Sequence, residues 1–252
     1  MTGPLFRTLF GNVAGMSRLA TLRDSPLSRE EIAATALRQF DERSSEPTIR
    51  SLARELRVAP TAIYHHFPSR AALFQSVVVL VWEEALVRLF AVVPDPFAAD
   101  PVDVLVASGL ATRQAWLSHP RVARYMAASP EANAFVNESV GTMANVFERL
   151  GLQGPEAAAA FHSYCSFMIG AVLFAADRSV ANEQLTEAGG ALWLPDYETP
   201  DQPDAGHWSS DRTRAEFDAV MRLSVTDPAT DEALFERGLR RMVTGFTGAT
   251  SR

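Results

Sequence analysis

The chain has 252 residues, of which 47% are hydrophobic and 21% are charged, the balance of an ordinary globular protein with enough length for a buried core. No apolar run approaches the roughly 20 residues that cross a bilayer, so no membrane span is expected. The single cysteine, Cys165, excludes an intramolecular disulfide and any zinc site built from several cysteines.

The formal net charge of −7 argues at first against a nucleic-acid partner, but the charge is unevenly distributed. Residues 1–70 hold ten arginines and seven acidic residues, a balance of +3. The remainder holds thirteen arginines and twenty-three acidic residues, a balance of −10. A basic end on an acidic body is typical of a protein that presents one end to phosphates, although such asymmetry also arises by chance.

Residues 1–26 are expected to form a flexible N-terminal extension. They lack a continuous apolar centre and a cleavage site, so no signal peptide is predicted and a cytoplasmic location follows. The extension is either an arm that reaches a minor groove, a disordered tail, or the product of an upstream start codon with Met16 as the initiator. The arm would use Arg7, Arg18 and Arg23.

The first predicted helix begins after Ser28, a natural N-cap, with Glu31 three residues further on in a capping box. Leu27 and Ile32 are placed to form a hydrophobic staple across that cap. The polar run over residues 41–47 ends the helix. Its apolar side chains recur on one face: Ile32, Ala33, Ala36, Leu37 and Phe40.

Two short helices and a long one follow. The second helix covers about 48–56, and a break over 57–59 separates it from a brief third helix over 60–67. That third helix opens on a proline, whose missing N–H is not needed in a first turn. Ser69 then caps a fourth helix that continues to about Val92.

Helical spacing continues through the rest of the chain, without the alternation typical of strands. Residues 186–210 hold three prolines and three glycines and are expected to form a long loop. We therefore predict an all-α fold of nine or ten helices. The later helices are expected over about 101–118, 120–127, 130–150, 155–180, 211–223 and 228–246.

The second and third predicted helices have the form of a helix-turn-helix. In that motif the first helix braces the second, whose outward face enters a major groove. Ile63 and Phe67 are four residues apart and point inward, whereas Thr61, Tyr64 and His65 lie on the other side. That outward face can donate and accept hydrogen bonds, and it is thin enough for a groove about 12 Å wide.

On these residues the chain resembles the DNA-binding domain of the TetR family of transcriptional regulators. Three positions depart from the family pattern. Arg57 stands where glycine is frequent, Arg70 where lysine is usual, and Ala59 where a serine cap is typical. The resemblance covers about residues 28–74 and rests on Thr48, Leu52, Ala53, Val58, Ile63, Tyr64, His66, Phe67, Ser69 and Leu73.

The resemblance implies a three-helix helix-turn-helix DNA-binding domain over 27–74, followed by a helical effector-binding and dimerisation domain over 75–252. It implies a homodimer on a palindromic DNA operator, a small hydrophobic effector, and repression as the default. Activation stays open. So does a DNA-binding dimer without a small-molecule effector, either constitutive or regulated by a protein.

Chemistry and resemblance together assign the DNA contacts. The amides at the start of the second helix are expected to hold a phosphate. Alternatives stand beside some positions: Tyr64 as a packing residue, Arg50 and Arg54 as a solvated face, and His66 as buried support. We assign phosphate or backbone contacts to Thr48, Tyr64 and Arg70, and base contacts to Thr61, Ala62 and His65. His65 is also a candidate for a backbone contact, and Arg50 is a further candidate DNA contact.

The predicted helix over 155–180 is apolar around most of its girth, so it must be covered both by its own domain and by a partner. We expect it to form a four-helix dimer interface with the last helix and their symmetry mates. Such a dimer sets two reading helices roughly 34 Å apart, matching a palindrome. The predicted interface residues are Tyr164, Met168, Val172, Leu239, Met242, Val243 and Phe246.

An effector pocket is expected in the same helical region, mostly apolar with a few polar groups. The residues chosen for it could equally be ordinary core. The candidate lining is Trp82, Leu86, Trp116, Tyr125, Met126, Phe135, Phe161 and His162.

Catalysis has one weak signal. His162 and Cys165 are three residues apart on a predicted helix, as a base and a nucleophile could be. The sequence places no third partner beside them, and it contains no GxSxG, GxGxxG, P-loop or HExxH motif. We therefore predict a protein that is not an enzyme and has neither a cofactor nor a metal site.

Overall fold

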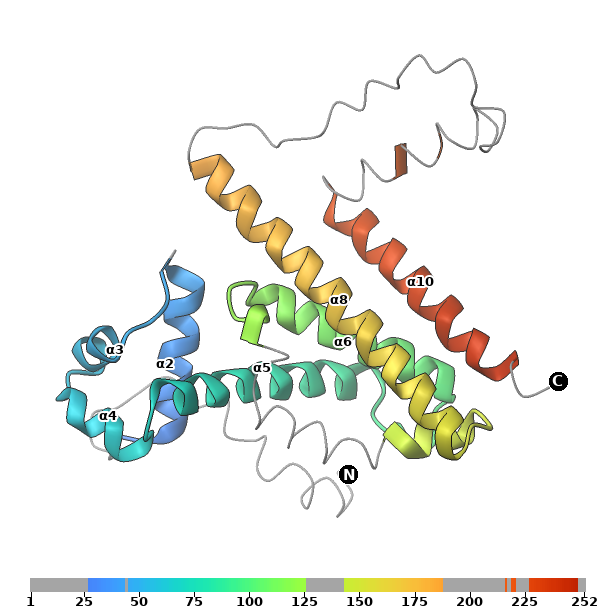
Figure 1. Cartoon of the computed structure of the whole chain (residues 1–252), viewed down its shortest axis with the longest axis horizontal. Helices are drawn as coiled ribbons and strands as arrows, with labels where there is room; N and C mark the ends of the chain where they lie inside the picture. The colour runs from blue at the N-terminus through green and yellow to red at the C-terminus, as the bar shows by residue number, and fades with distance from the viewer. Residues whose placement is uncertain are drawn as a thin grey trace.

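The computed structural model describes residues 27–43, 45–125, 143–187 and 227–248, together with 216, 219 and 220. Within these ranges every regular element is a helix, which confirms the predicted all-α class (Figure 1). Residues 143–149 are helical as well. The elements are α2 (Arg29–Glu42), α3 (Ile49–Leu56), α4 (Pro60–His66), α5 (Arg70–Val92), α6 (Pro101–Ser118), the 3-10 turn η2 (Ala123–Tyr125), α8 (Gly154–Glu187) and α10 (Pro228–Gly248).

The helix starts follow from local sequence. Ser28, Thr48 and Ser69 each accept a hydrogen bond, at 3.0–3.1 Å, from the backbone N–H three residues further on. Asp100 caps α6 in the same manner, and Pro101 follows at the first helical position. These bonds satisfy N–H groups that have no partner inside the helix, so each cap sets where its helix begins.

We call α2, α3 and α4 the head, and the elements from α5 to α10 the body. The helices of the head pack around one apolar centre that continues into the first turns of α5. Ile32, Phe40, Leu52, Ile63 and Leu73 lie in this centre, each no more than 1% exposed. Burying a side chain of this size stabilises the fold by about 1.5–3 kcal/mol. The head therefore shares its core with α5 and is held firmly to that helix.

The body is built on α5 and α6, which pack along each other, with α8 and α10 side by side beyond α6 (Figure 1). At Gly109, α6 packs tightly against α8 and α10. A Cβ atom there would lie 2.3 Å from Leu239 Cδ2 and 3.1 Å from Met168 Sδ. Close by, the hydroxyl of buried Tyr164 donates to the carbonyl oxygen of Leu105 at 2.9 Å. Only glycine allows this packing without displacement.

Two element predictions are wrong. The helix expected over 120–127 is, in its described part, only the turn η2. Val122, Ala123 and Tyr125 each donate to the carbonyl three residues back, the pattern of tight turns rather than an α-helix. The helix expected over 155–180 extends to Glu187, into the predicted loop, because residues 181–187 contain neither glycine nor proline.

The apolar length of α8 bears on the expectation that no segment spans a membrane. Its stretch Gly154–Ala181 is long and apolar enough to cross a membrane, by length and composition, although no such segment was predicted. A core helix meets the same criteria, and α8 packs against α6 and α10. Only 22% of its most apolar window is buried inside the chain, so much of an apolar helix remains on the surface.

Several predictions lie outside the described residues. These are the extension over 1–26 with its three arginines, the start of the helix over 130–150, and most of the loop over 186–210 and of the helix over 211–223. Two candidate effector residues, Met126 and Phe135, lie outside as well.

Candidate nucleic-acid interface

The break between α3 and α4 is a tight turn centred on Arg57. Its φ of 56° and ψ of 43° are left-handed, and among the described residues no other non-glycine has a positive φ. The N–H groups of Arg57 and Val58 donate to the carbonyl oxygens of Arg54 and Ala53, which closes the end of α3. As predicted, Ala59 offers α4 no side-chain cap. The helix-turn-helix geometry therefore holds without the usual glycine, at some cost in backbone strain.

A polar network braces α3 against α2. The amide of fully buried Gln39 donates to Glu55 at 2.5 Å and accepts from the Ser51 hydroxyl at 2.6 Å. Arg38 and Arg43 donate to the same Glu55 carboxylate. Burial raises the pKa of Glu55, but the bonds from Arg38 and Gln39 and the two positive charges outweigh it and hold that pKa below its usual value. The charged network thus fixes α3 against α2, and α3 in turn packs against α4.

Thr48 lies exposed at the start of α3. Its Oγ1 accepts from the Ser51 N–H, and Ser51 Oγ accepts from the Thr48 N–H, both at 3.0 Å. This capping box orders a helix end whose N–H groups and dipole favour an anion. The position predicted to hold a phosphate therefore has a rigid backbone.

The outward face of α4 carries Thr61, Tyr64 and His65, all exposed. Ile63, on the opposite side, is completely buried. Tyr64 is 52% exposed, which favours a surface role over the packing alternative. Ala62, the fourth predicted contact on this helix, is half-buried at the edge of the face. The helix therefore offers a narrow polar surface above an apolar anchor, as the motif requires.

Arg29 secures the far end of α4, although sequence reasoning did not single it out. Its guanidinium donates to the carbonyl oxygen of His66, and it lies 4.2 Å from the centroid of the Phe67 ring. His66 itself is half-buried, consistent with a supporting role. A cation at a helix C-terminus is favourable, so Arg29 stabilises the position of α4.

The predicted arginine contacts differ in their surroundings. Arg50, like its neighbour Arg54, is exposed on α3. Arg70, the first residue of α5, is 47% exposed and forms an ion pair with Glu46. Its guanidinium also lies 4.7 Å from the centroid of the Phe74 ring.

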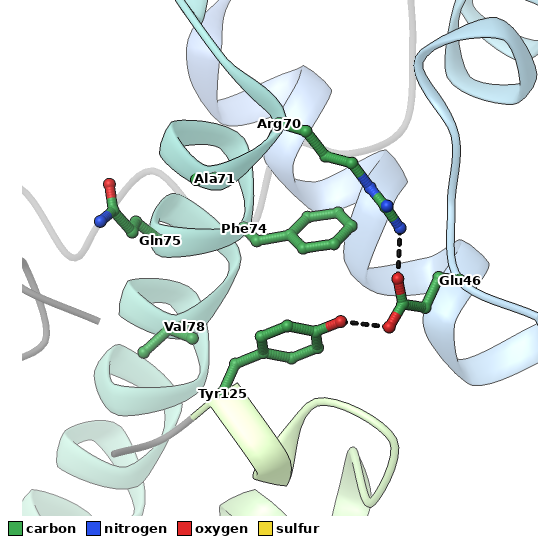
Figure 2. Close-up of a pocket in the computed structure, with 7 residues that line it drawn as sticks. All are labelled: Glu46, Arg70, Ala71, Phe74, Gln75, Val78 and Tyr125. Atoms are coloured by element: carbon green, nitrogen blue, oxygen red, sulfur yellow. Dashed lines mark hydrogen bonds and ion pairs between the residues drawn. The ribbon is translucent and has the colours of Figure 1, made fainter. Parts of the chain in front are cut away.

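Glu46 joins the head to the body (Figure 2). It lies between α2 and α3 and accepts from Arg70 on one oxygen and from Arg124 and Tyr125 on the other. The hydrogen bond from Tyr125 is the main reason why the pKa of Glu46 lies below its usual value, with burial opposing it. No sequence pattern pointed to this carboxylate, because its partners lie 24, 78 and 79 residues away.

Those predicted effector residues that the structure describes do not line one common pocket. Trp82 and Trp116 meet edge to face, with 5.4 Å between ring centroids, and Trp116 is fully buried. Leu86 is half-buried on the same helix as Trp82. Tyr125 instead packs against the head, where its ring centroid is 5.8 Å from that of Phe40 on α2.

The remaining two effector candidates lie on α8 and face different ways. Phe161 packs in the core between α6, α8 and α10, whereas His162 is exposed. Cys165 is half-buried, and burial raises the pKa of its thiol to about 11. A thiol of that pKa stays protonated near neutral pH, which disfavours a nucleophile at this position.

Five of the seven predicted dimer-interface residues face the core of their own chain, which argues against a direct contact of these five with a second chain. A side chain without exposed surface has nothing to offer a second chain. Apolar spacing on α8 could not show which side faces inward, because the helix is apolar around most of its girth. Tyr164, Met168, Val172, Leu239 and Val243 are at most 5% exposed, and Met242 and Phe246 are half-buried against the same core.

Two family models match the chain. The one described as "Bacterial regulatory proteins, tetR family" matches residues 32–77, and the one described as "Tetracyclin repressor-like, C-terminal domain" matches residues 94–249. The protein therefore belongs to the TetR family of bacterial regulators and is a DNA-binding transcriptional regulator. No curated protein sequence matches the chain.

Solved structures share the fold. A single-residue variant of TetR from Acinetobacter baumannii AYE, in complex with minocycline, is 21% identical with a TM-score of 0.61, over 90% of this chain and 100% of its own. ActR from Streptomyces coelicolor, in complex with (S)-DNPA, is 21% identical with a TM-score of 0.59, over 89% and 99%. BioQ bound to its natural double-stranded DNA operator is 24% identical with a TM-score of 0.53, over 65% and 94%.

Proposed function

We propose that the protein is a dimeric repressor that binds a palindromic operator through α3 and α4 and is released by a small hydrophobic ligand. The observation that carries the proposal is the exposed polar face of α4, held above the buried Ile63 by a braced α3. A helix presented in this way fits a major groove. The BioQ structure, which has the same fold, was solved with its DNA operator.

The contacts divide by chemistry. Thr48 and the first amides of α3 hold one phosphate, and Arg70 holds a second. Arg50 and Tyr64 contact the backbone on either side of the groove. Thr61, Ala62 and His65 face the base edges, where hydroxyl, methyl and imidazole groups can distinguish base pairs.

The dimer in this proposal uses the surface of α8 that its own chain leaves uncovered. Ser166 and Gly170 are exposed four residues apart, and Phe174, a further four along, is 66% exposed. Small residues followed by a large apolar one allow two helices to approach closely and bury a shared contact. Only 22% of the apolar window of α8 is buried within the chain, and in this proposal a second chain covers its exposed face.

Release follows from a shift between conformations. A ligand that prefers a dimer with its α4 helices too far apart for successive major grooves weakens DNA binding by its differential affinity. Relatives of the same fold were solved with minocycline and with (S)-DNPA, which supports a small-molecule effector. Within the predicted lining, the apolar ligand of this proposal binds beside Trp82 and Trp116, whose rings pack against each other.

Selection of DNA fragments by the purified protein at about 0.15 M salt, followed by footprinting, tests this function, since non-specific binding is screened at that salt. We expect a short palindromic footprint, which a Thr61→Ala/His65→Ala double variant loses while its circular dichroism is unchanged. Absence of sequence preference in the wild-type chain would refute the proposal.

A further inference from the structure

A cavity of about 270 Å³ lies between the first turns of α5 and the turn η2 (Figure 2). Its apolar wall is one face of α5, where Ala71, Phe74 and Val78 follow one another at helical spacing. The ring of Tyr125 forms the facing wall, and the Gln75 amide lies at the edge. Sites for small molecules begin at roughly 300 Å³, so this cavity lies just below that range and has room only for a compact ligand, of about two fused rings at most.

The end of the cavity is charged. Arg70 and Glu46 line it, and Arg124 joins them through Glu46. Two guanidinium groups thus share a single carboxylate, which leaves the cluster with one positive charge in excess. A guanidinium has five N–H donors, so Arg70 can accept a second anion beside Glu46.

We propose that this cavity binds a small aromatic carboxylate or a similar aromatic anion. Its ring lies against Ala71 and the exposed edge of Phe74, and its anionic group pairs with Arg70. A flat apolar body matches the aromatic walls, and a carboxylate matches the planar guanidinium in a two-bond pair. This site is separate from the pair Trp82 and Trp116 in the body.

The site regulates DNA binding because both functions use Arg70. This step rests on the proposed function, in which Arg70 holds an operator phosphate. A ligand anion on Arg70 displaces that phosphate, and a ring inserted beside Tyr125 loosens the bond from Tyr125 to Glu46. By linkage, operator DNA weakens ligand binding by the same factor.

Calorimetric titration of the full chain with 2-naphthoate tests the site without DNA. We expect 2-naphthoate to bind and its neutral counterpart 2-naphthamide to bind about tenfold more weakly, because the amide forms no ion pair. Ala71→Trp fills the cavity and Arg70→Gln removes the cation, and each should raise the Kd at least about tenfold. Ala91→Trp, at an exposed position near the other end of α5, is the matched control and should leave the Kd unchanged.

The outcomes separate the two proposals. Naphthoate binding that is equal in the wild type and Ala71→Trp overturns the site. A chain that protects an operator but does not bind naphthoate overturns the site alone. A chain without sequence preference whose naphthoate binding depends on Ala71 and Arg70 supports the site and overturns only the proposed DNA function.

Discussion

His119, directly after α6, lies with Nδ1 3.0 Å from both carboxylate oxygens of Asp41, in the last turn of α2. Its Nε2 is 2.9 Å from Glu84 Oε2 on α5. Burial opposes protonation of His119 most strongly, but the bonds and charges of Asp41 and Glu84 together outweigh it and raise its pKa. A protonated imidazole donates from both nitrogens, so His119 ties the head to two helices of the body.

Stability should therefore decline with rising pH. The pKa of His119 in the folded chain lies above its unfolded value of about 6.5, so its contribution is fully present below about pH 6.5 and is lost as the pH rises through the folded pKa. Arg88 and Arg121, which contact Glu84 and Asp41, stay charged throughout. Urea unfolding on both sides of this range measures the loss. His119→Gln should abolish it, whereas His162→Gln, at an exposed histidine, should keep it.

Arg70→Gln should weaken binding to every DNA sequence alike. Removing one phosphate contact lowers the slope of log affinity against log salt by about 1. Fluorescence anisotropy over a salt series measures that slope, and Arg237→Gln, an exposed arginine on α10, serves as the control. A loss confined to the operator would contradict the assignment of Arg70 to a phosphate.

His65→Ala should relax specificity at one base pair. A lost base contact costs about 1–3 kcal/mol against the preferred base and much less against the others. Affinities for a set of operators with single base changes reveal the position. Equal weakening across the whole set would show instead that His65 contacts the backbone.

Gly109→Ala should destabilise the body by about 1–3 kcal/mol, because the new methyl group meets Leu239 and Met168. Gly245→Ala is the matched control on α10, where a Cβ atom meets nothing within 4 Å. That change should stabilise its helix by up to about 1 kcal/mol. Urea unfolding measures the free energy of unfolding of both variants. If Gly109→Ala is as stable as the wild type, α6 does not pack as tightly against α8 and α10 as the structure shows.

Phe174→Asp should dissociate the proposed dimer. Phe174 is 66% exposed on α8, so a charge there opposes burial against a second chain without disturbing its own core. We expect the dissociation constant, measured by sedimentation equilibrium, to rise at least about tenfold. Val92→Asp, at a 74% exposed position on α5, should leave it unchanged. A wild-type chain that stays monomeric at all concentrations would contradict the dimer itself.

The head was predictable from the sequence because its determinants are local. Ser28, Thr48 and Ser69 mark helix starts through bonds that span three residues. Spacing alone separated the buried Ile63 from the exposed His65, since a short amphipathic helix has one apolar side. The helix-turn-helix follows from these features, whereas its candidate contacts rest also on the resemblance to the TetR family.

The body and the junctions were decided only by tertiary structure. When a helix is apolar on all sides, its sequence does not show which side faces the core. The sequence therefore did not show that Met168 faces the core and Phe174 the surface. Nor did it pair Glu46 with Tyr125, which lies 79 residues away. Contacts between distant segments leave no periodic trace along the chain, because only the packing of α2, α5 and η2 brings those side chains together.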